Sequence, residues 1–553
     1  MYSPSLQRCT VGSIPLAAAI AREIGLPDLL DQAVGSYGNE VIQPADTLMV
    51  LLFNITLGRQ PLYELHDWVG KMDPRCFMLP AAAVSQLNDD RFARALDKLY
   101  AADRASLMTD VVIRMIRSAS LDLQRVHNDS TTVKAYGKIP GVTAAGLELC
   151  KGKSKDHRPD LKQLLFCLTV SADGAVPVHY KSYSGNRTDD TTHIETWDTL
   201  NSIIGTPEFL YVGDCKLCTA KQLSYITEHG GRAVTIVPET WGEVKEFKAQ
   251  LRQAPKRKRK LLVRPGSASK PDTVYSLYAG SYGSTKGSHV IYWYHSSEKA
   301  CIDASTRQRR LRQADEQLTL LQSKLNKRKL TTRETVADRV NAIVKARRVA
   351  GLLEVTIAEI PQVSTKQIGK GRPGPHTTYR QETSSFITLA WTVNKHAVRQ
   401  ERRLDGIFPL LSTDSRLSAK QVLCAYKYQP KLEKRFTQFK SVHEAAPLLF
   451  KKIQRVEAMM FLFFLALMLQ ALIERKVRRH MKERTIDALP IYPEYRYASH
   501  PTTAKILGAF DEVSTYVVPM EDGTKKPFRD TLSATQKLIL SLLDITETQY
   551  WGD

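Results

Sequence analysis

Cysteine is scarce in this sequence, with eight residues among 553 at irregular spacing. Such a distribution excludes the disulfide framework of a small secreted protein. The close pair Cys215 and Cys218 has no second Cys or His pair at similar spacing, so we expect no zinc or redox site there. The first residues lack a charged stretch followed by an apolar one, so we also expect no signal peptide.

Long hydrophobic runs are also lacking, with one exception at residues 458–473. The run has 16 residues, includes Gln470 and is followed by charged residues, whereas a membrane-spanning helix needs roughly 20 apolar residues. We therefore predict a helix buried on all sides in a cytoplasmic protein, with no membrane as partner.

Acidic residues are in deficit, since 57 Asp and Glu stand against 79 Lys and Arg, a net charge of +22. The hydrophobic content of 43% is that of a globular protein and excludes disorder over most of the chain. The excess positive charge indicates an anionic partner, nucleic acid first and an acidic membrane surface second.

The first 120 residues have the apolar spacing of helices, over residues 14–34, 47–57 and 91–114, with a break at residues 25–28. No strand-like alternation is evident there, so we predict a compact all-α domain.

The pattern changes near residue 122. Short apolar runs predict strands at 123–126, 163–170, 176–180, 209–213 and 233–237, with helices at 191–204 and 220–229. Asp173-Gly174 joins the second and third strands as a hairpin. The order β-β-β-α-β-α-β predicts an α/β core with a mixed sheet.

Residues 240–400 interrupt this core. We predict a long helical pair over residues 298–348, restarted near Thr332, strands at 288–294, 353–363 and 386–393, and a loop at 369–375. Strand character resumes at 406–411, helices at 418–481, and a terminal helix at 533–543.

Asp129 and Asp214 each follow an apolar run of strand length. Strand ends in an open α/β sheet converge on one edge, and carboxylate oxygens suit Mg²⁺, so the pair could form a metal site. The alternative is that each Asp caps a helix or turn. His127, two residues before Asp129, is expected to pack or hydrogen-bond rather than bind metal.

A third acid, Glu433, lies seven residues after Tyr426 and seven before Lys440, which is one helical face if the helix is continuous. Pro430 favours the first turn of a helix, which would leave Tyr426 before it and Glu433 near its start.

These residues resemble the Tyr-Arg-Glu-Lys signature of bacterial insertion-sequence DDE transposases, with Gln429 in place of the Arg. Other segments in the same order also resemble one branch of that family, from about residue 10 to 545. They are residues 154–163, 185–189, 405–406, 455–458 and 472–475.

The resemblance implies an α/β fold, with a ribonuclease-H-like mixed-sheet core interrupted by a large β/α insertion and preceded by an all-α N-terminal domain. The implied parts are a helical DNA-binding and dimerisation domain (1–120), the first part of the catalytic core (121–240), the insertion (241–400), the second part of the core with the Glu-bearing helix (401–485), and a C-terminal linker and helix (486–553).

The activity implied is transposition: the enzyme binds the terminal inverted repeats of its element, cleaves the DNA ends and transfers the 3′-OH ends to target DNA. Asp129, Asp214 and Glu433 would bind Mg²⁺, with Mn²⁺ as a substitute, in two-metal-ion chemistry. Double-stranded DNA and at least a second copy of the chain are the expected partners, in the bacterial cytoplasm at the nucleoid. The alternatives are an inactive or domesticated DNA-binding protein and a hydrolytic nuclease with the same core.

Further cations are candidates for DNA-phosphate contacts. Tyr426 and Lys440 would position the end phosphates, and Lys427, Lys431 or Arg435 would replace the missing Arg. The remaining candidates are Lys216, Lys256, Arg257 and Lys258. Trp293 and Trp391 are expected in the core rather than stacked on a base.

Overall fold

The computed structural model describes two compact units, a larger one of Met1–Thr235 with Gln421–Asp553 and a smaller one of Ile236–Lys420. The described residues are 6–36, 38, 41–58, 60–77, 79–136, 139–152, 155, 158–187, 191–266, 270–279, 282–283, 289–327, 330–441, 443, 450–492, 494, 496–520 and 524–552. The first five residues lie outside them, as do five residues of the family-like segments, Ser154, Asp156, His157, Thr188 and Asp189.

The N-terminal part of the larger unit is mainly helical, as predicted. A break falls at Gly25, whose φ of +63° a glycine adopts without strain. The helices are α1 (Ile14–Glu23), α2 (Leu26–Val34), α3 (Pro44–Leu57), α4 (Leu65–Gly70), α5 (Asp89–Ala101) and α6 (Arg104–Ala119), with 3-10 turns at Leu62–Glu64, Pro74–Phe77 and Ala81–Gln86.

The prediction of an N-terminal part without strands is wrong. Strand β1 (Gln7–Thr10) pairs with β15 (Ser514–Pro519), which pairs with β16 (Lys525–Arg529) in a three-stranded sheet. The same sheet corrects the prediction that residues 486–532 are only a polar linker. A four-residue strand whose partner lies about 500 residues away leaves no local pattern, because its hydrogen bonds are entirely non-local.

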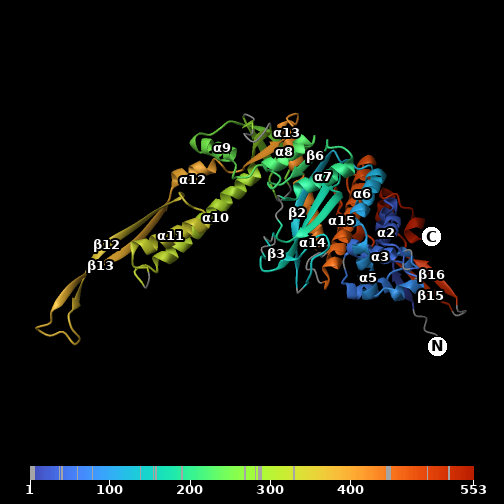
Figure 1. Ribbon diagram of the computed structural model, residues 1–553, viewed down its shortest axis with the longest axis horizontal. Coiled ribbons are helices and arrows are strands. Elements are labelled where there is room, and N and C mark those ends of the chain that lie inside the picture. The colour runs from blue at the N-terminus through green and yellow to red at the C-terminus, as the bar shows by residue number, and fades with distance from the viewer. Residues whose placement is uncertain are drawn as a thin grey trace. The chain divides into compact units, whose positions relative to one another are not determined.

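The sheet of the larger unit has the predicted mixed α/β character. Its strand order is β5, β4, β2, β6, β7, antiparallel among the first three and parallel from β2 to β7. Figure 1 labels β2 and β6 of this sheet. The elements are β2 (Arg125–Ala135), β3 (Cys150–Lys151), β4 (Lys162–Ser171), β5 (Pro177–Ser184), α7 (His193–Ile204), β6 (Leu210–Gly213), α8 (Ala220–Glu228) and β7 (Arg232–Ile236). The predicted hairpin between β4 and β5 is confirmed.

Helices after residue 418 complete the larger unit. Phe439 stacks on Phe166 of β4 at 4.5 Å and Phe464 stacks on Tyr180 of β5 at 4.9 Å, so two of these helices cover one face of the sheet. The helices are α13 (Ala419–Tyr426), α14 (Gln429–Ser441), α15 (Ile453–Glu483), α16 (Thr503–Gly508), α17 (Ala534–Leu542) and α18 (Glu547–Trp551).

Helix α15 carries the long apolar run. Among the described residues it is the helix whose length and composition would allow it to cross a membrane, and 94% of its most apolar stretch is buried inside the protein. The predicted burial of this helix is therefore confirmed.

The smaller unit combines a four-stranded path β14, β11, β9, β8 with a helical pair and a long hairpin. Its helices are α9 (Gly242–Gln253), α10 (Ser297–Gln322), α11 (Arg333–Arg347) and α12 (Lys395–Arg402). Its strands are β8 (Lys258–Arg264), β9 (Thr273–Tyr278), β10 (Tyr282–Gly283), β11 (Val290–Ser296), β12 (Leu353–Gln367), β13 (Tyr379–Val393) and β14 (Ile407–Ser412). The helical pair, with Thr332 capping α11, and the loop at 369–375 are as predicted.

Candidate active site

Asp129 lies within strand β2, and Asp214 directly follows the neighbouring parallel strand β6. The ladder between β2 and β6 pairs His127 with Val212, and each acid follows two residues later. Continuing this register sets Asp129 level with Asp214 on strands about 5 Å apart. Both carboxylates line one small pocket with Asn128, Ser130, Cys167, Thr192 and His193. The fold thus brings together two acids that are 85 positions apart in the sequence.

Local hydrogen bonds hold the two carboxylates. The Ser130 backbone N–H donates to Asp129 Oδ1 at 2.7 Å, and the Lys216 N–H donates to Asp214 Oδ1 at 2.9 Å. The Thr235 hydroxyl donates to the Asp214 carbonyl at 2.6 Å. The side chain of Asp214 therefore also caps the turn after β6, which is the alternative role that the sequence allowed for this residue.

Lys155 is a residue of this site to which the sequence assigned no role. Its ammonium donates to the carbonyl and hydroxyl of Ser130 at 2.6 and 2.8 Å and lies 3.6 Å from Asp129 Oδ1. It belongs to the family-like segment 154–163, which was the signal available in the sequence. The contact places a positive charge beside the first acid.

Glu433 lies on the helix α14, whose first residue packs on strand β2. Gln429, at the start of α14, is 8% exposed, donates to the Asn128 carbonyl at 3.3 Å and contacts His127 Nδ1 at 3.4 Å. Glu433 lies four residues further, on the same face of the helix one turn on. Gln429 therefore joins the Glu-bearing helix to the strand that carries Asp129.

The Tyr426 hydroxyl shares the surroundings of all three acids. Tyr426 ends α13, so its helix is not continuous with α14, as Pro430 indicated. Burial raises the pKa of Tyr426 above its ordinary value, and the pKa rises further through the negative charges of Asp214, Cys215, Asp129 and Glu433. The hydroxyl therefore keeps its proton at neutral pH and can donate a hydrogen bond.

His127 packs and hydrogen-bonds inside the protein, as expected. Its ring is buried against Tyr428 at 4.9 Å, and burial lowers the pKa of His127 to about 3, so the ring is neutral at pH 7. Trp293 is a core residue, as expected, and stacks on Phe247 at 3.9 Å. Trp391 is partly buried and packs against the apolar cluster of the helical pair α10/α11.

The predicted DNA contact of Arg435 is wrong. Arg435 is 5% exposed, forms an ion pair with Glu474 at 2.7 Å and donates to the carbonyls of Gly174 and Ala175 at 2.9 and 3.0 Å. A guanidinium engaged in this way fixes α14 to α15 and to the β4–β5 turn, and it is not available to phosphate. The residue faces inward because it lies two positions from Glu433, away from the exposed side of α14.

The other predicted cations lie in two places. Lys216 is exposed beside Asp214, and Lys427 and Lys440 are half-buried near the two ends of α14. In the smaller unit, Arg257 and Lys258 line a cavity of about 580 Å³ with Tyr278 and Tyr292, while Lys256 lies 4.9 Å from the Phe247 ring centroid.

The donor chemistry of the pocket suits a hard divalent cation, since Asp129 and Asp214 offer carboxylate oxygens together. Among the described residues, no three His, Cys, Asp or Glu side chains lie close enough to form a complete ion site. The carboxylates that the pocket itself provides are therefore those of Asp129 and Asp214. Glu433, the third acid predicted from the sequence, lies on the helix α14.

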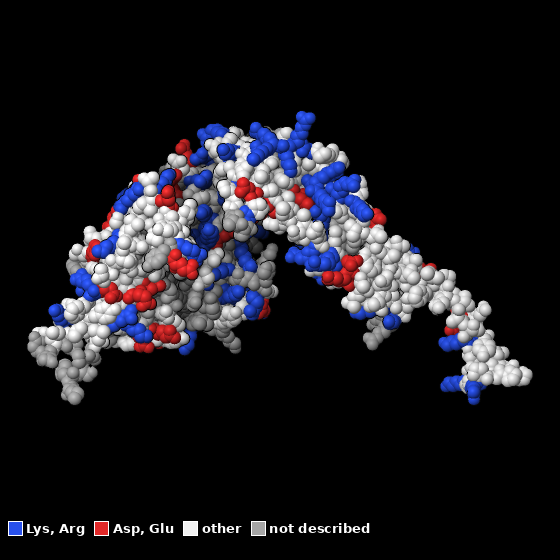
Figure 2. Space-filling view, turned by 180° about the vertical axis from the view of Figure 1, so that it is seen from behind, with Lys and Arg blue, Asp and Glu red and all other residues white. Residues whose placement is uncertain are grey.

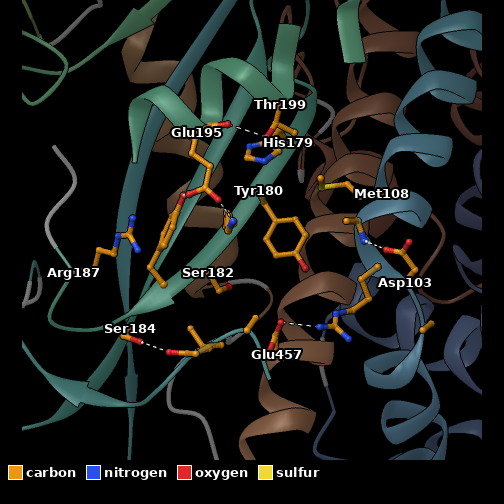
Figure 3. Close-up of a pocket in the computed structure, with 18 residues that line it drawn as sticks. Asp103, Met108, His179, Tyr180, Ser182, Ser184, Arg187, Glu195, Thr199 and Glu457 are labelled. Atoms are coloured by element: carbon orange, nitrogen blue, oxygen red, sulfur yellow. Dashed lines mark hydrogen bonds and ion pairs between the residues drawn. The ribbon is translucent and has the colours of Figure 1, made fainter. Parts of the chain in front are cut away.

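A second cavity, of about 620 Å³, lies between α6, β5, α7 and α15 (Figure 3). Its walls carry an Arg104–Glu457 ion pair at 2.7 Å and a Tyr183–Glu195 hydrogen bond at 3.1 Å. His179 is 3% exposed there, and its burial lowers the pKa of His179 to about 4. Within the described part of the chain, His179 Nδ1, Ser182 Oγ and Glu457 Oε2 have no hydrogen-bond partner. Nothing in the sequence pattern indicated this cavity.

Comparison with known proteins gives limited similarity. Residues 6–113 match a family described as a domain of unknown function, DUF4277. No curated protein matches the chain. A solved structure of the piggyBac transposase synaptic complex with hairpin DNA aligns with 51% of this chain at 11% identity and a TM-score of 0.27. The alignment spans 60% of that transposase chain, less than two thirds of its length.

Proposed function

We propose that this protein is a DDE transposase that cleaves the ends of its own insertion sequence and joins the 3′-OH ends to target DNA. The observation that carries the proposal is the placement of Asp129 on β2 and Asp214 directly after the parallel strand β6, level with each other and in one pocket. Gln429 also fixes the helix of Glu433 to β2. Over residues 125–236 the long elements β2, β4, β5, α7, β6, α8 and β7, with the two-residue strand β3 between β2 and β4, follow the order β-β-β-α-β-α-β, and this order supports a ribonuclease-H-like core.

Asp129, Asp214 and Glu433 would hold Mg²⁺ or Mn²⁺ in this enzyme. A pair of such ions supplies an activated water and stabilises the leaving 3′ oxygen of a phosphodiester. The protonated Tyr426 hydroxyl donates a hydrogen bond to an anionic group at the site, and Lys216, Lys427 and Lys440 bind neighbouring phosphates. The five predicted domains, the bacterial cytoplasm as location and a homodimer on paired DNA ends are part of the same proposal.

The test is a Mg²⁺-dependent cleavage and joining assay with duplexes that carry the inverted repeats flanking the coding region. We expect wild-type protein to cut and join, and Asp129→Asn, Asp214→Asn and Glu433→Gln each to lose at least about a thousandfold in rate, since residues that act as one unit fail together. Asp110→Asn is the matched control, because Asp110 is an exposed acid on α6. Activity that survives Asp129→Asn would exclude the assigned site.

A DNA-binding protein without catalysis is the second candidate. The observation that favours it is the Lys155 ammonium 3.6 Å from Asp129, where it offsets the charge that a cation would need. Tight binding of the inverted repeats by wild-type protein, with no cleavage or joining in Mg²⁺ or Mn²⁺, would favour this candidate over the transposase.

A further inference from the structure

The smaller unit projects a two-stranded ribbon from a fixed base. Strands β12 and β13 pair over their full length, from Leu353 with Val393 to Gln367 with Tyr379. At the base, Ile387 and Leu389 are 1% and 3% exposed against α10 and α11, and the Asn326 side chain bonds both the N–H and the carbonyl of Ile387. The ribbon is thus held firmly where it begins.

The distal ribbon, residues 361–385, has no such cover. Val363 and Tyr379 are 59% and 53% exposed, and this half of the hairpin extends beyond the helical pair (Figure 1). Seven residues on each strand span about 23 Å before the tip. Such a length with both faces open is suited to contact with a large partner rather than with the rest of this unit.

The side chains of the distal ribbon are mostly basic or hydrogen-bonding, as in surfaces that bind nucleic acid. Four Lys and Arg stand against one Glu, a net charge of +3, and Figure 2 shows blue side chains gathered near its end. Glu382 pairs with Arg380 and, at 3.5 Å, with Lys366, so its charge is offset within the ribbon. Neutral hydrogen-bonding side chains fill most other strand positions: Gln362, Ser364, Thr365, Gln367, Gln381, Thr383, Ser384 and Ser385.

The tip carries one cation on each side of a glycine, in the sequence Lys370-Gly371-Arg372, and all three residues are exposed. Gly371 has a φ of +132°, and no atom lies within 4 Å of where its side chain would begin. A backbone without a side chain can approach a groove floor closely. The minor groove is about 6 Å wide, and its narrow A·T-rich form concentrates negative potential that attracts Arg and Lys.

We propose that the distal ribbon docks on double-stranded DNA and that Lys370 and Arg372 at its tip enter an A·T-rich minor groove. The proposal rests on DNA being the partner in the function proposed above. A protein partner fits less well, because the exposed apolar side chains on the strands of the distal ribbon form no continuous face: Val363 and Tyr379 lie on one face with a polar pair, Thr365 and Gln381, between them.

The experiment compares the full-length protein with Lys370→Gln/Arg372→Gln by fluorescence anisotropy, on A·T-rich and G·C-rich duplexes of equal length in EDTA. We expect wild-type protein to prefer the A·T-rich duplex. The tip variant should bind that duplex at least about fivefold more weakly, lose the preference, and show a salt dependence shallower by about 2 in log–log slope. Netropsin, which occupies the A·T minor groove, should weaken wild-type binding and leave the tip variant unchanged.

The matched control is Lys324→Gln/Arg339→Gln, which removes two exposed cations from the same unit and should keep the preference. A tip variant that binds both duplexes as wild type does would overturn the proposal. So would a tip variant that changes self-association, by analytical ultracentrifugation, without changing DNA affinity, because the ribbon would then serve a second copy of the chain.

Binding in EDTA is independent of strand cleavage. A protein that binds through its tip but never cuts DNA would therefore refute the proposed transposase and leave the ribbon proposal standing. If the wild-type protein cuts and joins DNA, but the tip variant binds DNA as the wild type does, the proposed transposase would stand and the ribbon proposal would be refuted.

Discussion

Gln429 occupies the position where the resembling family has an Arg, and its surroundings explain why an uncharged residue is suited to it. The side chain is buried between His127 and the Asn128 carbonyl, where a guanidinium would lose its hydration without gaining a carboxylate. An amide satisfies one donor and one acceptor there. The residue therefore acts through position, by fixing α14 over β2.

We expect Gln429→Ala to lower the free energy of unfolding by about 1–3 kcal/mol, because it leaves a buried carbonyl and the His127 ring without their partner. Urea denaturation followed by circular dichroism measures the change. Lys434→Ala, at an exposed position of the same helix, should stay within about 0.5 kcal/mol. Equal stability of the two variants would contradict the role given to Gln429.

His179 predicts a pH dependence of stability. Its pKa is about 4 in the folded protein against an ordinary value of 6.5, so the unfolded chain takes up the proton first as the pH falls. The free energy of unfolding should therefore decrease from about pH 6.5 toward pH 4, by up to about 1.4 kcal/mol per pH unit from this group. His179→Gln should flatten the slope of stability against pH over this window. An unchanged slope would show that the ring is protonated in the folded state.

At the scale of elements, helix α14 carries an exposed acid on one side and a buried base on the other. Glu433 is exposed, whereas Arg435 turns inward to Glu474 of α15. Breaking such a buried pair costs more than removing an exposed charge, because the remaining partner is left uncompensated. The β12/β13 ribbon shows a similar division along its length, with an anchored base and an exposed distal half.

We expect the distal ribbon to contribute little to stability. Replacing residues 361–385 by Asn-Gly would close the hairpin after the Ile360–Phe386 pair with a favoured two-residue turn. The free energy of unfolding should change by less than about 1 kcal/mol, because few buried contacts are removed. Leu389→Ala in the base should instead cost about 2–5 kcal/mol. A large loss on shortening the ribbon would mean that its distal half packs against something.

At the scale of the whole molecule, the two ends of the chain meet in the larger unit. Strand β1 pairs with β15, and the buried Tyr550 hydroxyl of α18 donates to the Gly12 carbonyl at 2.7 Å. The C-terminal residues are thus part of the same folded body as the N-terminal helices.

Tyr550→Phe should lower the free energy of unfolding by about 1 kcal/mol, since it removes one buried hydrogen bond and leaves the Gly12 carbonyl without it. Differential scanning calorimetry measures the change. Tyr63→Phe is the control, because Tyr63 is 76% exposed. If both variants have the melting temperature of the wild type, the two ends do not stabilise each other.

Local pattern was sufficient for many elements. The hairpin at Asp173-Gly174, the helical pair with its restart at Thr332, the buried apolar helix and the strand before Asp214 follow from periodicity, turn residues and capping. Their hydrogen bonds and apolar faces recur at fixed short spacings, so a single stretch of sequence contains the information. The strand predicted at 123–126 is longer in the structure, because β2 (Arg125–Ala135) continues past Asp129 in its ladder with β4.

What a residue faces was decided only by tertiary structure. The inward turn of Arg435, the Lys155 contact with Asp129, the pairing of β1 with β15 and the cavity around His179 all join segments distant in the sequence. By itself the sequence determined the order of strands and helices, the positive charge and the candidate acids, because these depend on neighbours along the chain. The register that sets the two aspartates level, and the partners of each buried charge, depend on neighbours in space, which only the folded chain supplies.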